Sequence, residues 1–198
     1  MKTISLRQPL AYLICSGIKD IENRTWKLPE KYKNERVLIH ASVKPNISIL
    51  DSSVVFSEWQ WNYLKGFDML LPFFQFKLAT SAIIGSVEIV DCVINHPSIW
   101  AEKTMFDYGG ICYKNKCEHF KRWSFGHGDC ESCELVGQSY LVETIPDDCL
   151  FKKQMPKPIY NWVLANPILF DKPILNVKGK LSFWDYDLPE EYETILKI

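Results

Sequence analysis

The 198-residue sequence contains no apolar run near the ~18 residues that a membrane-spanning helix needs. Met1-Lys2-Thr3-Ile4 is followed by polar residues and not by the apolar core of a signal peptide. Internal repeats and low-complexity stretches are also missing. We therefore expect neither membrane insertion nor secretion, and the sequence predicts a cytoplasmic protein with a single domain over residues 1–198.

The sequence also has little net charge, because its positive and negative residues nearly balance at -1. The charge is nevertheless unevenly distributed. Residues 1–50 carry nine Lys or Arg and four Asp or Glu, a balance of +5, which leaves -6 for residues 51–198. A positive N-terminal part would attract an anionic partner such as a nucleic acid or a nucleotide-like ligand. The alternative is a solvated, lysine-rich surface without a ligand.

The seven cysteines are an odd number and lack a secretory context, which argues against a disulfide framework. Four of them form two close pairs: four residues separate Cys112 from Cys117, two separate Cys130 from Cys133, and twelve lie between the pairs. Four thiolates in this pattern are typical of a zinc ribbon. Two nearby histidines are alternative ligands, His119 and His127. The sequence predicts a structural zinc in an insertion at about 104–157, and free thiols are the alternative.

Hydrophobic patterning predicts short strands at residues 3–6, 36–42, 81–94, 159–165 and 181–186. A helix is predicted after Pro9 and should end at Gly17, and a second helix is predicted over residues 48–64. Gly85, inside the strongest strand, indicates a bulge or a close backbone approach. Many short strands with few helices predict an α+β fold with a small, closed or nearly closed sheet.

The extended segment at residues 17–26 (GIKDIENRTW) does not fit a buried strand. With strict alternation, one face would carry Asp20, Glu22, Arg24 and Trp26, and the other Lys19, Ile21, Asn23 and Thr25. Neither face is apolar. Because conflicts between local pattern and fold concentrate at functional sites, this segment is the main candidate site.

Several sequence blocks resemble the ASCH domain family, named for its homology to activating signal cointegrator 1. They are residues 4–11 (ISLRQPLA), 17–26, 37–42 (VLIHAS), 83–92 (IIGSVEIVDC), 160–167 (YNWVLANP) and 178–184 (KGKLSFW). The resemblance implies a small β-barrel similar to the PUA fold, with flanking helices and a cleft for RNA or another nucleic acid. The cysteine-containing insertion interrupts the resemblance.

The Gly-x-Lys-x-x-Glu-x-Arg pattern of this family matches Gly17, Lys19, Glu22 and Arg24, and the resemblance implies that they lie near the cleft. Arg24 offers a planar fork for a phosphate or a base edge, and Lys19 offers a point charge. Glu22 would accept a hydrogen bond from the amino group of a base or hold Arg24 in place. A simple ion pair between Glu22 and Arg24 is the structural alternative.

Four further residues are candidates for nucleic-acid binding. Trp26 could stack on an unpaired base, and His40 is a cleft candidate within an apolar strand. Arg7 and Gln8 flank a helix start, where an anion could meet free backbone amides. The alternatives are packing for Trp26 and His40, and surface contacts for Arg7 and Gln8.

An enzymatic function stays open. Some proteins similar to this family are amidohydrolases that remove an acyl group from a modified cytidine with a lysine, a threonine nucleophile and a glutamate. Lys19 matches the lysine, but Glu22 occupies the position of the threonine, and Glu88 is a candidate second acid. No His, Asp or Glu constellation supports a nuclease. A binding module for RNA or single-stranded nucleic acid is therefore the main prediction, and a protein-interaction adaptor that uses the insertion is a third reading.

Overall fold

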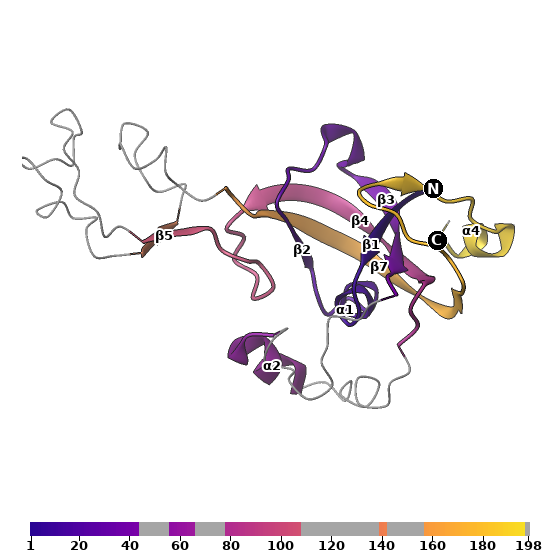
Figure 1. Ribbon diagram of the computed structural model, residues 1–198, viewed down its shortest axis with the longest axis horizontal. Helices are drawn as coiled ribbons and strands as arrows, with labels where there is room; N and C mark the ends of the chain where they lie inside the picture. The colour runs from indigo at the N-terminus through magenta and orange to yellow at the C-terminus, as the bar shows by residue number, and fades with distance from the viewer. Residues whose placement is uncertain (44–55, 66–77, 108–138, 142–156, 197–198) are drawn as a thin grey trace, which may run out of the picture.

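The computed structural model describes residues 1–43, 56–65, 78–107, 139–141 and 157–196 (Figure 1). Its centre is a mixed sheet with the order β2-β7-β4-β3-β1-β8, in which β1 and β3 are parallel and the other neighbours are antiparallel. The strands of this sheet are β1 (Lys2–Leu6), β2 (Ile21–Arg24), β3 (Glu35–Ala41), β4 (Ala82–Ile94), β7 (Tyr160–Ile174) and β8 (Trp184–Asp185). A separate pair consists of β5 (Met105–Asp107) and β6 (Ser139–Leu141).

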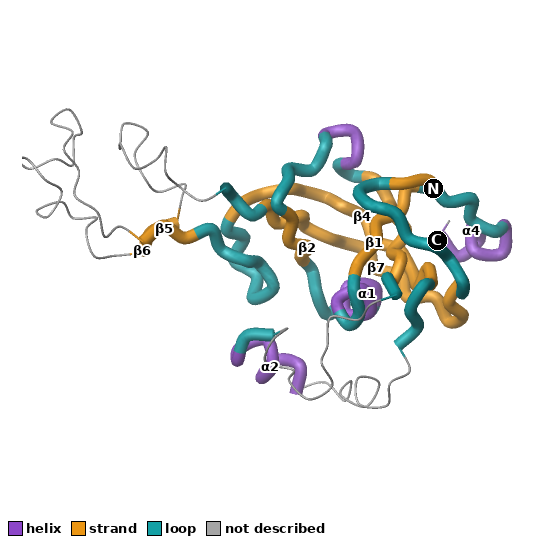
Figure 2. The backbone as a smooth tube through the Cα atoms, in the orientation of Figure 1, coloured by secondary structure: helices purple, strands orange, loops and turns teal. Residues whose placement is uncertain are grey.

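In the described part of the chain, four short helical segments accompany the strands. They are α1 (Leu10–Cys15), the 3-10 helix η1 (Glu30–Tyr32), α2 (Glu58–Lys65) and α4 (Glu190–Leu196). Helix α1 contacts β3, β4 and β7 and lies against the sheet, and Leu64 of α2 packs in one apolar cluster with Ile21 of β2. The β5–β6 pair lies apart from the sheet (Figure 2). Among the described residues, no helix has the length and apolar character to cross a membrane.

The N-terminal elements form where the sequence predicts them. Strand β1 begins one residue earlier than predicted, Pro9 is the N-cap of α1, and Gly17 follows the helix with φ +78°. Only glycine adopts that conformation without strain, which explains why the helix ends there. Of the second predicted helix, at residues 48–64, α2 covers Glu58–Lys65; residues 56–57 are not helical, and residues 48–55 lie outside the described part.

Gly85 in β4 is confirmed as a place of close backbone approach. A Cβ atom at this position would lie 2.1 Å from the carbonyl oxygen of Ile168 on β7 and 2.9 Å from Sγ of Cys15 on α1. The register between β4 and β7 also shifts between Ile83 and Gly85. Glycine therefore lets α1, β4 and β7 pack together.

The two C-terminal strands differ from their predicted lengths. Strand β7 continues to Ile174 because Asn166, with φ 47°, absorbs a register shift before Pro167 and the strand then resumes. Strand β8 is limited to Trp184–Asp185, and Leu181 is 94% exposed. Apolar content alone had suggested a longer strand there.

The predicted closed or nearly closed barrel is wrong for the described residues, since β2 and β8 are the two ends of an open sheet. Strand β1 pairs with β8 only at Lys2 and Thr3. Side chains fill the remaining gap towards β2: Phe183 stacks on Trp162 with ring centroids 5.4 Å apart. The gap between the edge strands is thus closed by side chains and not by a backbone ladder.

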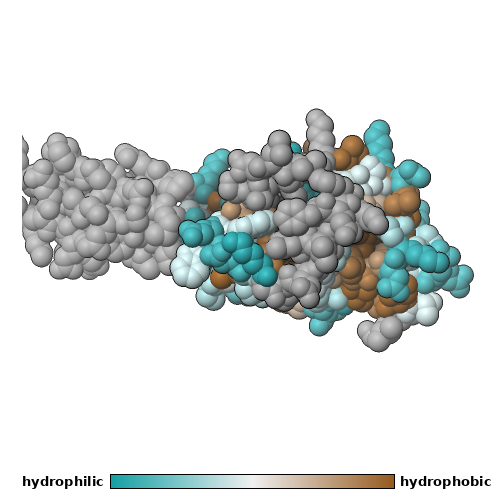
Figure 3. Space-filling view, turned by 90° about the horizontal axis from the view of Figure 1, so that it is seen from below, coloured by the Kyte–Doolittle hydropathy of each residue, from teal (hydrophilic) through white to brown (hydrophobic). Residues whose placement is uncertain are grey.

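Two apolar clusters lie on the two faces of the sheet next to β2. One contains Trp162, Ile39 and Val87 with Trp26 and Phe183 against it, and the other contains Ile21, Leu13 and Trp100. In the view from below, hydrophobic residues gather towards the right-hand end of the molecule (Figure 3).

Candidate nucleic-acid interface at the open sheet edge

Strand β2 places the charged residues of the 17–26 segment on one face. Glu22 lies opposite Trp162 and Arg24 opposite Tyr160 in the antiparallel ladder with β7. Directly opposed residues of antiparallel strands point to the same side. Glu22 and Arg24 therefore share a face with Trp162.

The predicted alternation fails before the strand begins. Asp20 precedes β2 and accepts a hydrogen bond from Oγ of Ser98 at 2.6 Å, so its carboxylate turns away from Glu22. Lys19, predicted on the opposite face, instead reaches the carboxylate of Glu22. The alternation of side chains between the two faces of a strand does not extend to residues 19–20, because they are not in a regular strand.

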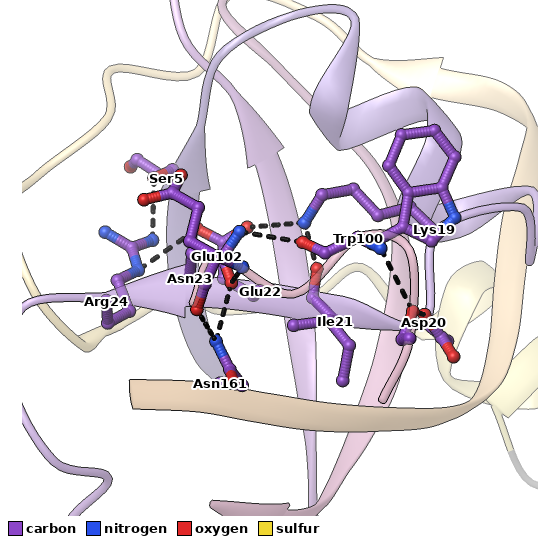
Figure 4. A network of polar contacts seen from close by, with 11 residues as sticks. Ser5, Lys19, Asp20, Ile21, Glu22, Asn23, Arg24, Trp100, Glu102 and Asn161 are labelled. Atoms are coloured by element: carbon purple, nitrogen blue, oxygen red, sulfur yellow. Dashed lines mark hydrogen bonds and ion pairs between the residues drawn. The ribbon is translucent and has the colours of Figure 1, made fainter. Parts of the chain in front are cut away.

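Lys19, Glu22 and Arg24 form one buried group, which we call the β2 triad (Figure 4). Nζ of Lys19 lies 3.4 Å from Oε2 of Glu22, and Nε of Arg24 lies 3.1 Å from Oε1 of Glu22 without hydrogen-bond alignment. The side chains of Lys19 and Glu22 are 4% and 9% exposed, whereas that of Arg24 is 24% exposed. The structure thus brings together three of the predicted site residues, and Arg24 is the member that solvent reaches best.

Lys19 also protects the open edge of the sheet. Its ammonium group donates to the carbonyl oxygen of Ile21, on the edge strand β2. Burial lowers the pKa of Lys19, and the negative charge of Glu22 opposes this shift. An anion that approached the triad would favour the charged form of Lys19 further.

Arg24 connects β2 to β1 across the gap in the sheet. Its Nη2 donates to the carbonyl oxygen of Ser5 at 3.4 Å, and its guanidinium carbon lies 5.7 Å from the centre of the Trp162 ring. The Glu22 carboxylate, the Ser5 carbonyl and the Trp162 ring restrict the orientation of the guanidinium group. Neither Ser5 nor Trp162 was predicted as a site residue, although both lie in the sequence blocks that resemble the ASCH family.

A small cavity of about 50 Å³ lies beside Lys19. Its walls include Gly17, Asp20, Val87 and Pro167. This volume is close to that of one or two water molecules in the liquid. The cavity gives the buried lysine a small space on the side of α1.

The opposite face of β2 holds the loop that follows β4. Asn23 donates to the carbonyl oxygen of Trp100 at 2.9 Å and accepts from the amide of Glu102 at 3.1 Å. Buried Asn161 donates to Oδ1 of Asn23 at 2.9 Å and accepts from the amide of His96 at 2.9 Å. Sequence reasoning did not single out these two asparagines, because an amide that binds backbone groups has no distinctive pattern.

Trp26 lies in an aromatic cluster next to the triad. Its ring meets that of Trp162 edge to face at 4.7 Å and that of Phe183 at 5.9 Å. Trp26 is half-buried, so part of its surface remains accessible. The structure therefore places this candidate beside Arg24 by way of Trp162.

The two candidates at the start of α1 differ in exposure. Gln8 is buried, donates to the carbonyl oxygen of Ala79 at 2.8 Å and accepts from the amide of Tyr12 at 3.1 Å. Both ends of its amide thus hold α1 and a neighbouring segment. Arg7 is exposed.

His40 is buried beneath the segment that precedes β8. Its Nε2 donates to the carbonyl oxygen of Val177 at 2.9 Å, and its ring meets that of Trp184 edge to face at 5.7 Å. Nδ1 has no hydrogen-bond partner. Burial lowers the pKa of His40, which favours the neutral ring.

Glu88 lies in a different polar group. Arg36 donates to its Oε1 at 2.7 Å and Asn166 to its Oε2 at 2.7 Å, and these interactions, with that of Asn166 the larger, lower its pKa. Its neighbour Val87 lines the cavity beside Lys19, so Glu88 on the same strand points to the other face. The structure does not bring Glu88 to the β2 triad.

The predicted zinc ligands Cys112, Cys117, Cys130 and Cys133 lie outside the described residues, as do the two alternative histidines. Within the described part of the chain, no group of three or more His, Cys, Asp or Glu could hold a metal ion. Of the described cysteines, Cys15 and Cys92 are free thiols. Zinc binding by the insertion stays a prediction.

The fold and the edge site define the class of protein: an α+β domain with one mixed sheet and a buried charged group at its edge strand. The family model of the ASCH domain matches residues 4–174. The chain therefore belongs to the ASCH domain family, whose PUA-like fold is often linked to RNA binding.

Eight chains of solved structures match this chain, including the following two. One is ASCH from Zymomonas mobilis, at 12% identity, a TM-score of 0.41 and coverage of 100% of this chain and 94% of that chain. The other is a mutant of that protein, at 12% identity, a TM-score of 0.40 and coverage of 100% and 96%. No curated protein matches the chain.

Proposed function

We propose that this ASCH protein is a module that binds single-stranded nucleic acid, RNA in the first place, or a nucleotide-like ligand, at the β2 triad. The observation that carries the proposal is the position of Glu22 between two cations. Its two carboxylate oxygens lie 3.4 Å from Lys19 and 3.1 Å from Arg24. With both cations charged, the triad itself has one excess positive charge, and the charges of Asp20 and Glu102 also act on Lys19.

This excess charge favours an anionic partner. Buried charges are screened by salt much less than exposed ones, so the triad attracts a phosphate more strongly than a surface lysine does. The positive balance of residues 1–50 adds a longer-range attraction of the same sign. Phosphate groups are the anions that every nucleic acid offers.

Arg24 is the residue through which the ligand would contact the triad. Glu22, Ser5 and Trp162 restrict its guanidinium group, and restricted donors lose little conformational entropy on binding. The planar fork of arginine suits a phosphate or the edge of a guanine. Half-buried Trp26, in the same aromatic cluster, would provide a surface for an unpaired base.

A nucleoside amidohydrolase is a second candidate, supported by the lowered pKa of Lys19. A buried lysine that loses its proton more readily is suited to general base catalysis. Two observations weigh against this function: Glu22 stands in place of a hydroxyl nucleophile, and Glu88 is held by Arg36 and Asn166. Turnover of an N-acylated cytidine that disappears in Lys19→Arg would support it, and turnover that survives this substitution would exclude a lysine-centred mechanism.

The binding proposal is tested by fluorescence anisotropy with a labelled single-stranded RNA at several salt concentrations. We expect Arg24→Gln to weaken binding by about fivefold or more, in line with the ~1–3 kcal/mol of a good arginine contact, and to reduce the salt dependence. The affinity of the Arg24→Lys variant should lie between those of the unchanged protein and of Arg24→Gln, because lysine keeps the charge but not the planar fork of arginine.

Arg36→Gln is the matched control, since Arg36 is also a partly buried arginine that pairs with a glutamate. Its affinity for the RNA should equal that of the unchanged protein. Equal affinities of the Arg24→Gln and Arg36→Gln proteins would contradict the proposal that the triad binds the ligand.

A further inference from the structure

A second positively charged site lies on the other side of Ser5. It is a surface hollow of about 420 Å³, which we call the β8 hollow, lined by Lys178, Lys180, Trp184, Asp185 and their neighbours. Both lysines are exposed, whereas Trp184 is 7% exposed and lies beneath them. The hollow is separate from the residues of the β2 triad, and none of the candidate site residues lines it.

The backbone that carries the two lysines is fixed at both ends. The carbonyl oxygen of Val177 accepts from His40 at 2.9 Å, and that of Lys180 accepts from Oγ of Ser5 at 2.9 Å. Gly179 packs so closely on His40 that a Cβ atom would lie 2.4 Å from the ring. The loop at residues 177–180 is therefore held against the sheet, and its lysines extend from a fixed backbone into solvent.

The charges around the hollow favour an anion. Nζ of Lys180 lies 5.7 Å from the centre of the Trp184 ring, a cation-π distance that keeps the ammonium group over the hollow. Asp185 pairs with Lys2 at 2.8 Å, which neutralises one of the two carboxylates in the lining. The lining holds two lysines and the two aspartates Asp185 and Asp187; because Lys2, outside the lining, neutralises Asp185, one positive charge remains in excess.

Ser5 connects the hollow to the triad. Its carbonyl oxygen accepts a hydrogen bond from Arg24 at 3.4 Å, and its hydroxyl group donates one to the main-chain carbonyl oxygen of Lys180 at 2.9 Å. The guanidinium group of Arg24 and the main chain of Lys180 thus contact the same residue of β1. A single extended anionic chain across β1 could reach both.

We propose that the β8 hollow binds a phosphate group of the same single-stranded RNA that contacts Arg24. This inference rests on the proposed function and extends it: the ligand is a strand of several nucleotides and not a single nucleotide. Lys178 and Lys180 supply the contacts to its backbone. Since such contacts are not specific for a base, they add affinity and salt dependence and no sequence preference.

The test compares Lys178→Gln and Lys180→Gln by fluorescence anisotropy with a mixed-sequence RNA of about nine nucleotides, a length within the usual range of single-strand sites. Each variant should bind this RNA about 3- to 10-fold more weakly, and each lost phosphate contact should lower the slope of log affinity against log salt by about 0.7. Binding of uridine monophosphate, followed by calorimetry, should not change. Lys65→Gln on α2 is the control for charge alone, because it also removes one exposed lysine.

Thermal melting establishes that the variants are folded, which is expected because exposed lysines contribute little to stability. If both lysine variants bind the nine-nucleotide RNA like Lys65→Gln while Arg24→Gln weakens it, the hollow is not part of the site, and the proposed function still stands. If the lysine variants weaken binding and Arg24→Gln does not, the triad is not the ligand site and the shared strand is refuted with it.

Discussion

The guanidinium group of Arg24 donates to the main-chain carbonyl oxygen of Ser5 at 3.4 Å. Through this contact, a side chain of the edge strand β2 reaches β1, on the other side of the gap that the backbone ladder leaves open. Because Glu22 pairs with the same guanidinium group from within β2, the triad both connects β2 to β1 through a side chain and presents a cation at the sheet edge. Its residues should therefore affect stability as well as binding.

Removal of the carboxylate from the triad is expected to destabilise the fold. Glu22→Ala would leave the buried ammonium group of Lys19 without its counter-ion, and breaking a buried ion pair in this way costs about 3–5 kcal/mol. Urea denaturation measures the loss. Glu35→Ala, at an exposed position of β3, should change the free energy of unfolding by less than about 0.5 kcal/mol. Similar values for the two variants would show that the buried pair contributes nothing.

Buried His40 is expected to make stability depend on pH. Its pKa in the folded protein is lowered from 6.5, so the unfolded chain takes up the proton first as the pH falls. The melting temperature should decrease below about pH 6.5, the ordinary pKa of histidine. His40→Gln should reduce this dependence, whereas His96→Gln should preserve it. If the pH dependence of the melting temperature is unchanged in His40→Gln, it does not come from His40.

Gly179 is expected to tolerate no larger residue while His40 is present. The Cβ atom of Gly179→Ala would lie 2.4 Å from Cε1 and 2.7 Å from Nδ1 of His40, so the ring or the loop must move, at a cost of about 1–3 kcal/mol. In the His40→Ala background the same substitution should cost less, and a double-mutant cycle measures this coupling. Strict additivity of the two substitutions would contradict the packing of the loop on the ring.

The insertion is expected to be dispensable for folding of the core. The amide of Ile159 donates to Oγ1 of Thr104 at 2.8 Å, so the two ends of the interrupted region meet at one place. Replacement of residues 105–157 by a short Gly-Ser linker should leave a cooperative unfolding transition with nearly the same midpoint, because a shorter loop costs less closure entropy. Asn161→Ala, which breaks a buried network beside this place, should lower the midpoint and serves as the positive control. A linker variant that fails to unfold cooperatively would show that the insertion belongs to the core.

The two cysteine pairs are expected to bind one zinc ion per chain. Native mass spectrometry of the protein purified without chelators should show the mass of the bound metal, and Cys130→Ser should remove it. Cys92→Ser, which changes a free thiol outside the insertion, should leave the metal bound. A metal-free mass for the unchanged protein would refute the zinc ribbon.

Local structure was the part most easily predicted from the sequence. Pro9 and Gly17 mark the ends of α1, and the β-branched run around Gly85 gives β4, because caps and periodicity act over a few residues. The unusual 17–26 segment was also found, since it fits no ordinary strand. The length of β7 was not predicted, because Pro167 indicates the end of a strand in the sequence. In the structure, a bulge at Asn166 lets the strand continue past this proline.

The sequence by itself determined the family, the short elements and the three charged residues of the β2 triad, since each of these depends on residue types and spacing. Only the tertiary structure decided that the sheet stays open, that Asp20 leaves the face of Glu22, and that Ser5 lies between Arg24 and Lys180. The physical reason is distance along the chain. Contacts between β1, β2 and the segment before β8 join residues up to about 175 positions apart, and which of them meet depends on how the whole sheet packs.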